Sequence, residues 1–209
     1  ARIAERLAQS GPTVSQTVAR MERDGLLHVA GDRQLSLSEH GRTLATRVMR
    51  KHRLAECLLV SVIELPWEEV HIEACRWEHV ISESVERRLF EMLGHPVRCP
   101  HGNVIPGLDE LGISPEAKEL ANCGAGGDEA MTSAASREPA PVIIQRISEQ
   151  IQSDLALMLK LKRTGIQPGR EVMLAASDDG VRVRCDDSAD GAEAELPREI
   201  AAHVFVSRT

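Results

Sequence analysis

The sequence predicts a mainly α-helical chain in which both ends also contain β-strands. Three observations support this fold class. Apolar residues recur at helical spacing over most of the first 93 positions. Two short alternating segments flank Gly31-Asp32-Arg33 and indicate a hairpin. Beyond residue 142, short apolar runs are separated by turn residues such as Asp178-Asp179-Gly180, which is typical of a small β domain.

The first 45 residues are predicted to form a winged helix-turn-helix. An amphipathic helix covers 1–9, and the Gly and Pro of Ser10-Gly11-Pro12 break it and open the next helix, which runs to about Asp24. Segments 26–30 and 34–37 form the hairpin, or wing. Ser38 then caps a long helix through Arg53 and on toward Ile63.

The remainder is divided by composition. Residues 46–113 are predicted as a helical domain that includes a helical region at 66–93 and a loop at 101–107. Residues 114–141 are small and polar, and we expect a flexible linker with little capacity to form a core. The last domain, 142–209, is expected to contain a helix at 153–163 and strands at 142–147, 171–175, 181–185 and 204–206.

Charge is unevenly distributed along the chain. Residues 1–53 hold ten Lys and Arg against five Asp and Glu, a net charge of +5, which leaves −12 for the remainder of a chain whose total is −7. A basic N-terminal segment followed by an acidic remainder, here called the basic head and the acidic body, is typical of a protein that contacts nucleic acid through one end only. The five cysteines lack CxxC spacing and indicate reduced thiols in a cytoplasmic protein.

No apolar run approaches the length of a membrane span, and no signal peptide opens the sequence, so no membrane partner is expected. The chain begins with Ala inside a helical pattern, which we interpret as a segment lacking its N-terminal part.

The start of the second predicted helix has the composition of a DNA-recognition helix. Such a helix needs short hydroxyl or amide side chains at its N-terminal end, which reach phosphates and base edges. Gln16 is the best candidate for reading adenine, and Arg20, Arg23 and Arg33 are placed to contact phosphates. The alternative is a small helical domain with ordinary polar caps, since helix-turn-helix patterns have real false-positive rates. The basic charge and the adjoining hairpin favour DNA binding.

Six metal-capable side chains lie between residues 51 and 79 at helical spacing. His52 and Glu56 are four residues apart, and His71, Cys75, Glu78 and His79 all fall on one face of a helix at about 100° per residue. Histidine, carboxylate and thiol together suit a transition metal rather than Mg²⁺ or Ca²⁺. The spread over two helices allows two sites, His52–Glu56–His71 and Cys75–Glu78–His79. The remaining histidines, including His101, are interpreted as ordinary core or surface residues.

Two enzymatic interpretations use the same residues. Cys75-x-x-Glu78-His79 differs by one ligand from the H-x-x-E-H pattern of inverted zinc peptidases, in which Glu78 would be a general base for a zinc-activated water. Alternatively, Cys75 is a nucleophile activated by His79. Neither explains the basic head, and a thiol in place of the first His argues against an open hydrolytic zinc site.

Several long motifs resemble the diphtheria toxin repressor family of iron-dependent regulators. The resemblance covers residues 1–112 and, more weakly, 142–209. The motifs that carry it are Ala1–Leu7, Gln9–Val18, Met21–Leu26, Met49–Glu56, Glu73–Val80 and Ile105–Leu108. It implies a winged-helix domain, a helical metal and dimerisation domain and an SH3-like C-terminal domain. It also implies a homodimeric repressor that binds palindromic double-stranded operator DNA of iron-homeostasis genes and is activated by Fe²⁺, with Mn²⁺, Co²⁺, Ni²⁺ or Zn²⁺ as substitutes.

The resemblance also assigns roles to residues. His52, Glu56 and His71 match the ancillary metal site, and Cys75, Glu78 and His79 match the primary, activating site. Arg53 and Asn103 match positions that contact an anion beside the ancillary metal. The positions that match DNA-reading residues are Ser10, Pro12, Thr13, Ser15 and Gln16.

Three departures from the family pattern stand out. The primary site also uses a Met from the first helix, which this chain lacks. Where the third domain donates a Glu and, three residues later, a Gln to the ancillary metal, we place Asp154 and Leu157, of which only Asp154 can coordinate. Cys99 stands where an anion-contacting Ser is expected.

Overall fold

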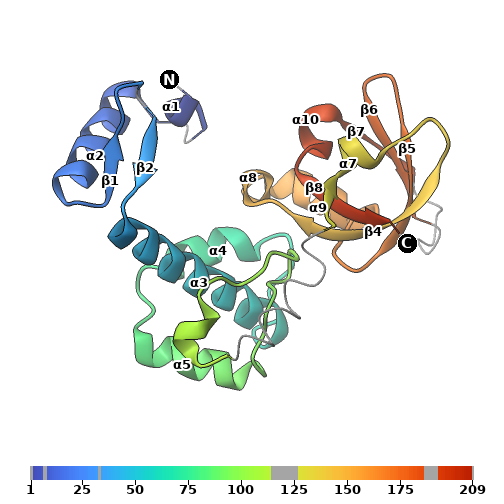
Figure 1. The fold of residues 1–209 in the computed structure, drawn as a ribbon. Helices are drawn as coiled ribbons and strands as arrows, with labels where there is room; N and C mark the ends of the chain where they lie inside the picture. The colour runs from blue at the N-terminus through green and yellow to red at the C-terminus, as the bar shows by residue number, and fades with distance from the viewer. Residues whose placement is uncertain (1, 7–8, 33, 114–126, 186–192, 209) are drawn as a thin grey trace. The chain divides into compact units, whose positions relative to one another are not determined.

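The computed structural model describes residues 2–6, 9–32, 34–113, 127–185 and 193–208, which group into two compact units, Ala1–Val48 and Met49–Thr209 (Figure 1). Each unit is described by itself. Within the described residues, no helix combines the length and the apolar character that crossing a membrane requires.

The first unit contains the predicted helix-turn-helix and wing (Figure 1). It comprises α1 (Arg2–Arg6), α2 (Gly11–Arg23), an antiparallel hairpin of β1 (Leu27–Val29) and β2 (Leu35–Leu37), and the start of α3 (Glu39–Ser61). Ser10 caps α2 by accepting a hydrogen bond from the Thr13 amide at 3.2 Å. Ser38 caps α3 in the same way, with the Gly41 amide at 3.0 Å. The predicted order of helix, turn, helix and hairpin is confirmed.

The second unit begins with the remainder of α3, which packs with α4 (Val70–Trp77), α5 (Glu83–Met92) and a 3-10 helix, η1 (Leu108–Leu111). The region 66–93, predicted as helical throughout, is interrupted between α4 and α5. Ser82 caps α5 by accepting from the Val85 amide at 3.3 Å, and this local capping starts a new helix. Glu78 is the C-cap of α4, so Glu78 and His79 lie beyond its last helical residue. Glu78 nevertheless keeps helical dihedral angles and contacts His52, so the expectation that all four ligand-type residues share one helical face is wrong for His79.

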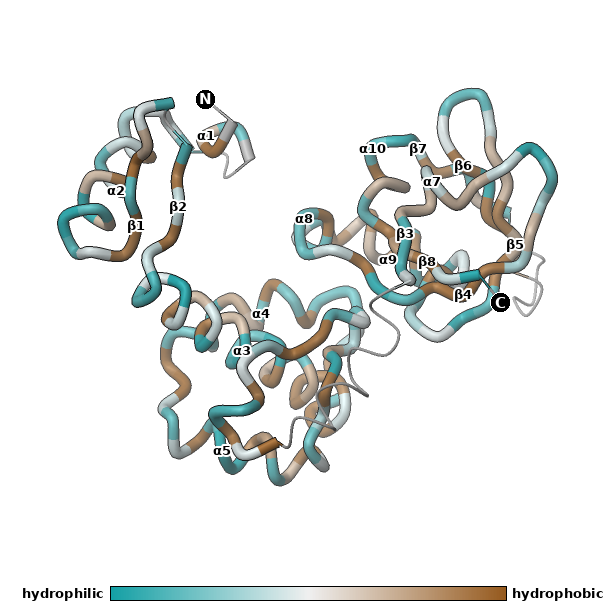
Figure 2. The backbone as a smooth tube through the Cα atoms, viewed as in Figure 1, coloured by the Kyte–Doolittle hydropathy of each residue, from teal (hydrophilic) through white to brown (hydrophobic). Residues whose placement is uncertain are grey.

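The rest of this unit is a six-stranded antiparallel sheet in the order β3-β8-β4-β5-β6-β7. Figure 2 shows hydrophobic residues concentrated along its strands, where alternate positions enter the core. The strands are β3 (Glu129–Ala130), β4 (Ala140–Ile147), β5 (Glu171–Ala176), β6 (Gly180–Arg184), β7 (Glu193–Pro197) and β8 (Val204–Arg208). The helices around it are α7 (Met131–Ala134), α8 (Glu149–Gln152), α9 (Leu155–Arg163) and α10 (Arg198–Ala201).

The described part of the predicted linker, 114–141, is structured. Residues 114–126 lie outside the described residues, but Glu129–Ala130 pair with β8, and the Met131 side chain is fully buried in the sheet's core. The expected linker at 127–141 is thus corrected. The sequence does not indicate that this segment is structured, because its residues are small or polar and only Met131 has a large apolar side chain.

Hydrogen bonds connect the helical part of the second unit, residues 49–113, to β4 and to α9. Asn103 Nδ2 donates to the Ile147 carbonyl at 2.8 Å, and the Ile147 amide donates to the His101 carbonyl at 2.9 Å. Lys162 Nζ on α9 donates to Glu68 Oε2 at 2.7 Å. The loop that carries residues 101–103 is therefore held against the end of β4.

The Lys162–Glu68 contact predicts a pH effect on stability. Burial by itself raises the pKa of Glu68, but the hydrogen bond from Lys162 outweighs burial and lowers that pKa. A lowered carboxyl pKa stabilises the fold above the unfolded-state pKa, and this contribution is lost as pH falls through the folded-state value. Glu68→Gln should therefore cost about 1 kcal/mol or less at neutral pH, because Lys162 is partly exposed. In urea unfolding, the difference from the native chain should shrink on acidification; a constant difference would contradict the assignment.

Candidate metal centre

The candidate centre lies between α3 and α4. His52 and Glu56 are one turn apart on α3, and His71 and Cys75 are one turn apart on α4, so each pair occupies one helical face. His52 and Glu56 are buried, His71 is half-buried and Cys75 is exposed. The sequence predicts both pairs correctly, and the fold turns them toward each other.

These side chains form one continuous cluster. His52 Nε2 lies 3.1 Å from both Glu56 Oε1 and His71 Nδ1, and Glu56 Oε1 lies 3.4 Å from His71 Nδ1. Cys75 Sγ lies 3.7 Å from His71 Nε2. One donor atom from each of His52, His71 and Cys75 falls within 4.8 Å of the other two. Cys75 therefore lies with the histidines that the sequence analysis assigned to a separate site.

Glu78 connects this cluster to His79. Its Oε2 lies 2.7 Å from His52 Nδ1, and its Oε1 lies 3.1 Å from His79 Nε2. The His79 side chain is 67% exposed, since it follows the end of α4. The structure thus connects all six predicted residues through direct contacts, with His79 at the exposed edge, where it contacts only Glu78 among them.

The electrostatics of the cluster are strongly coupled. Burial opposes protonation of His52, but hydrogen bonds to Cys75 and Glu56 raise its pKa to about 10. Burial also opposes protonation of His71, but hydrogen bonds to Cys75 and Glu56 raise its pKa to about 9. Hydrogen bonds from His52 and His71 lower the pKa of Cys75 to about 7. Burial opposes ionisation of Glu56, yet hydrogen bonds from His101, His52 and His71 lower its pKa well below the usual value.

The donor set fits a transition-metal ion. Bonds of about 2.0–2.3 Å to N, O and S in a tetrahedral site place donor atoms roughly 3.3–3.8 Å apart. Here one donor atom from each of His52, His71 and Cys75 lies within 4.8 Å of the other two; His71 faces His52 with Nδ1, at 3.1 Å, and faces Cys75 with Nε2, at 3.7 Å. Imidazole, carboxylate and thiolate ligands suit Fe²⁺, Co²⁺, Ni²⁺ or Zn²⁺. Since ligands must lose their protons, metal uptake would release protons from this cluster.

His101, interpreted from sequence as an ordinary core or surface residue, is part of the same cluster. It is fully buried, and its Nδ1 lies 3.1 Å from Glu56 Oε1. Cys99 lies nearby and is also buried. No spacing rule could have found this contact, because it joins α3 to a loop 45 positions later.

Residues expected at the anion and ancillary positions have the following partners. Arg53 forms an ion pair with Glu149 and donates to the Val104 carbonyl. Asp154 caps α9 by accepting from the Leu157 amide at 3.0 Å. Gln152 is fully buried, its Nε2 donates to the Ile147 carbonyl at 2.7 Å, and its Oε1 lacks a partner among the described residues. Glu149 and Gln152 therefore offer a Glu-x-x-Gln spacing that the sequence analysis overlooked.

The predicted DNA-reading residues lie at the start of α2. Thr13, Ser15 and Gln16 are exposed there, as are Arg20 and Arg23 farther along the helix. Ser10 is exposed as well, but its hydroxyl is engaged in the cap, 2.7 Å from Thr13 Oγ1. Pro12 occupies the first turn. Arg33 lies outside the described residues.

Sequence comparison gives two family matches. Residues 1–35 match the family described as "Iron dependent repressor, N-terminal DNA binding domain". Residues 38–107 match "Iron dependent repressor, metal binding and dimerisation domain".

Individual relatives indicate the same family. The chain is 56% identical over 184 residues to the iron-dependent repressor IdeR of Mycobacterium tuberculosis (strain H37Rv), covering 86% of this chain and 76% of that protein. It is 49% identical over 201 residues to the diphtheria toxin repressor of Corynebacterium diphtheriae, covering 96% and 84%. Among solved structures, it is similar to T. acidophilum IdeR, with a TM-score of 0.73, 29% identity and coverage of 100% and 88%. A manganese-dependent transcriptional repressor complexed with manganese gives a TM-score of 0.77, 29% identity and coverage of 99% and 89%.

Proposed function

This chain belongs to the iron-dependent repressor family, and from that premise we propose that it is an Fe²⁺-activated repressor that acts in the cytoplasm as a homodimer on palindromic operator DNA. The observation that carries the proposal is the cluster of metal-capable side chains between α3 and α4. The same chain also has an exposed helix, α2, with the composition of a DNA-recognition helix. Repression without catalysis is part of the proposal.

We assign the metal ligands in two groups. His52, Glu56 and His71 would hold the ancillary ion; Cys75, Glu78 and His79 would hold the activating ion, with His79 turning inward from its exposed position. Glu149 and Gln152 replace Asp154 as the proposed ligands from the third domain, because Gln152 has a buried oxygen without a partner among the described residues, whereas the Asp154 carboxylate caps α9. The bound ion would supply the link that selects the DNA-binding conformation.

DNA readout is proposed to centre on Gln16. Gln16→Ala should cost roughly 1–3 kcal/mol of binding to an operator selected from a random pool, and it should relax preference at one base pair. Arg20→Ala should weaken binding to all DNA sequences about equally and reduce the salt dependence of DNA binding, as expected for a phosphate contact. Competition binding with single-base operator variants checks both. If Arg20→Ala changed sequence preference and Gln16→Ala did not, the proposed docking would be wrong.

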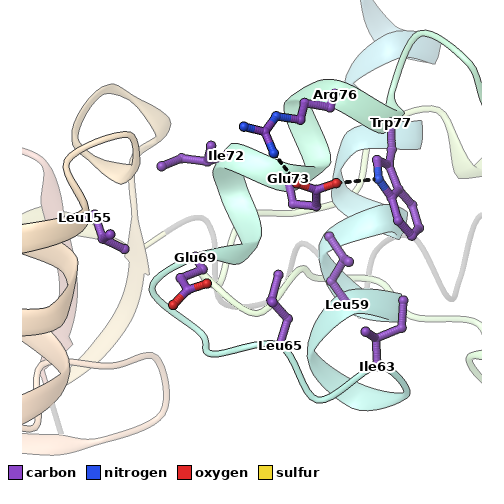
Figure 3. Close-up of a pocket in the computed structure, with 9 residues that line it drawn as sticks. All are labelled: Leu59, Ile63, Leu65, Glu69, Ile72, Glu73, Arg76, Trp77 and Leu155. Atoms are coloured by element: carbon purple, nitrogen blue, oxygen red, sulfur yellow. Dashed lines mark hydrogen bonds and ion pairs between the residues drawn. The ribbon is translucent and has the colours of Figure 1, made fainter.

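The homodimer is proposed to form through the apolar groove in Figure 3. Leu59, Ile63, Leu65 and Trp77 line it, and at its rim Glu73 Oε1 accepts from Trp77 Nε1 at 2.8 Å while Glu73 pairs with Arg76. Apolar residues with a charged rim are typical of interfaces between protein chains. A second copy of the chain is the proposed occupant, since the family match includes a dimerisation domain over these residues.

Ile63→Glu tests this surface. Ile63 is 49% exposed, so the substitution should be tolerated in the monomer, but in a dimer it would bury an unpaired charge. An interfacial penalty of about 2 kcal/mol or more raises the dimer dissociation constant roughly thirtyfold or more. Val85, 48% exposed on α5 and outside this groove, gives the matched control Val85→Glu. Sedimentation equilibrium should show dissociation only for Ile63→Glu; the reverse result would move the interface to α5.

A further inference from the structure

Cys99 and His101 give Glu56 a second set of possible metal-binding neighbours. Glu56, Cys99 and His101 each offer one donor atom, and these atoms lie within 4.8 Å of one another. All three side chains are buried, and none needs Cys75, Glu78 or His79 to complete the group. This set, the Glu56–Cys99–His101 group, contains the thiol that stands where the family pattern has an anion-contacting serine.

Three imidazole nitrogens crowd a single carboxylate oxygen of Glu56. Its Oε1 lies within 3.4 Å of one nitrogen from each of three imidazoles, those of His52, His71 and His101. An oxygen has two lone pairs and accepts two hydrogen bonds well. His101 Nε2, moreover, is buried without a partner among the described residues. Buried polar atoms left in this way call for an explanation such as an ion or a water.

The loop that carries Cys99 and His101 is fixed in place. The Cys99 amide donates to the Asn103 carbonyl at 2.9 Å, and the Gly102 amide donates to the Cys99 carbonyl at 2.8 Å. Gly102 has a φ of 83°, and a Cβ there would lie 1.9 Å from the Gln145 carbonyl oxygen, so the loop is pressed onto β4. The His101 ring packs on Trp67 with centroids 4.9 Å apart. Such support limits the reorganisation that ligand binding requires.

We propose that Glu56, Cys99 and His101 form a second thiol-containing metal site, which takes Zn²⁺ or a similarly thiophilic divalent ion independently of Cys75. Thiolate, imidazole and carboxylate are the ligands that zinc uses in proteins. On binding, the Cys99 thiol loses its proton to solvent and the sulfur becomes a ligand. Because Glu56 also belongs to the His52–His71 cluster, its carboxylate is shared between the two metal positions.

The test uses the full, reduced chain and Co²⁺ as a spectroscopic probe for the zinc site. In the Cys75→Ser protein, a thiolate-to-cobalt charge-transfer band should persist. Cys75→Ser/Cys99→Ser should abolish the band, and Cys75→Ser/His101→Phe, which keeps an aromatic ring against Trp67, should weaken it. Two controls are made in the Cys75→Ser protein: Cys57→Ser, next to Glu56 in sequence, and Cys123→Ser. Each should leave the charge-transfer band unchanged. Loss of the band with Cys75→Ser alone, or its survival in Cys75→Ser/Cys99→Ser, would overturn the proposal.

A second measurement covers the case in which the double variants do not fold. Zinc-edge X-ray absorption of the Cys75→Ser protein with bound Zn²⁺ should show sulfur in the first coordination shell. A shell of nitrogen and oxygen only would refute the site. Neither experiment involves DNA, so its failure is distinguishable from failure of the proposed repressor function, which is measured by Fe²⁺-dependent DNA binding.

Discussion

Cys75→Ala should abolish the metal-dependent gain in DNA affinity while leaving the fold intact. Cys75 is exposed on α4, so its truncation opens no cavity in the core. Its thiol, however, lies among the imidazoles of His52 and His71, where it would supply the sulfur ligand. Coupling between two binding sites is typically worth about 1–3 kcal/mol, or roughly 5–150-fold in affinity, and we expect the variant to lose all of it.

The measurement is DNA affinity with and without Fe²⁺, with far-ultraviolet circular dichroism to show that the variant is folded. Arg88→Ala on α5 is the control and should keep its metal response, because Arg88 pairs with Glu91 at the surface and lies outside both the cluster and the groove proposed for the dimer. A normal response in Cys75→Ala would remove Cys75 from the activating site. Metal-dependent peptidase activity that requires Glu78 would instead favour the zinc-hydrolase interpretation.

Arg50→Met should destabilise the second unit by about 3–5 kcal/mol. Arg50 and Glu86 are both buried, and Arg50 Nε donates to Glu86 Oε1 at 2.6 Å. Arg50 also donates to the Gly107 carbonyl at 2.6 Å and to Glu110 at 3.2 Å. Methionine fills similar space but leaves Glu86 as an unpaired buried charge, which accounts for the size of the loss.

Urea unfolding followed by circular dichroism gives the free energy of unfolding for this comparison. Arg88→Met is the matched control, since Arg88 pairs with Glu91 at the surface and exposed ion pairs contribute roughly 0–1 kcal/mol. Equal losses for the two variants would show that burial of the Arg50–Glu86 pair has no energetic consequence.

The local parts of the fold and site could be predicted from the sequence. Ser38 and Gly25 delimit elements through short-range caps and turns, and His52–Glu56 and His71–Cys75 are neighbours because an α-helix repeats every four residues or so. The same periodicity misplaced His79, because α4 ends at Trp77 with Glu78 as its C-cap, and a separate helix capped by Ser82 follows. Periodicity alone does not report where a helix stops.

Long-range contacts were beyond the reach of the sequence. Glu56 meets His101, and Arg50 meets Glu86, only because loops and helices distant in the chain pack together. The strand β7 was not predicted although acidic and apolar residues alternate in Glu193-Ala194-Glu195-Leu196, because the segment is short and lacks β-branched and aromatic residues; its pairing with β6 defines it. The resemblance placed Asp154 at the ancillary position and did not identify Glu149 and Gln152, because the sequence pattern does not reveal the short helix α8 that carries them.

The most direct test of the central claim is an oxygen-free Fe²⁺ titration of DNA binding by the intact protein. The DNA is a double-stranded fragment selected from a random pool, and binding is followed by fluorescence anisotropy. The metal-activated repressor account predicts that affinity rises as Fe²⁺ is added, reaches a plateau and returns to its starting value when a chelator removes the metal. Affinity that does not change between the chelated and Fe²⁺-saturated protein would contradict it.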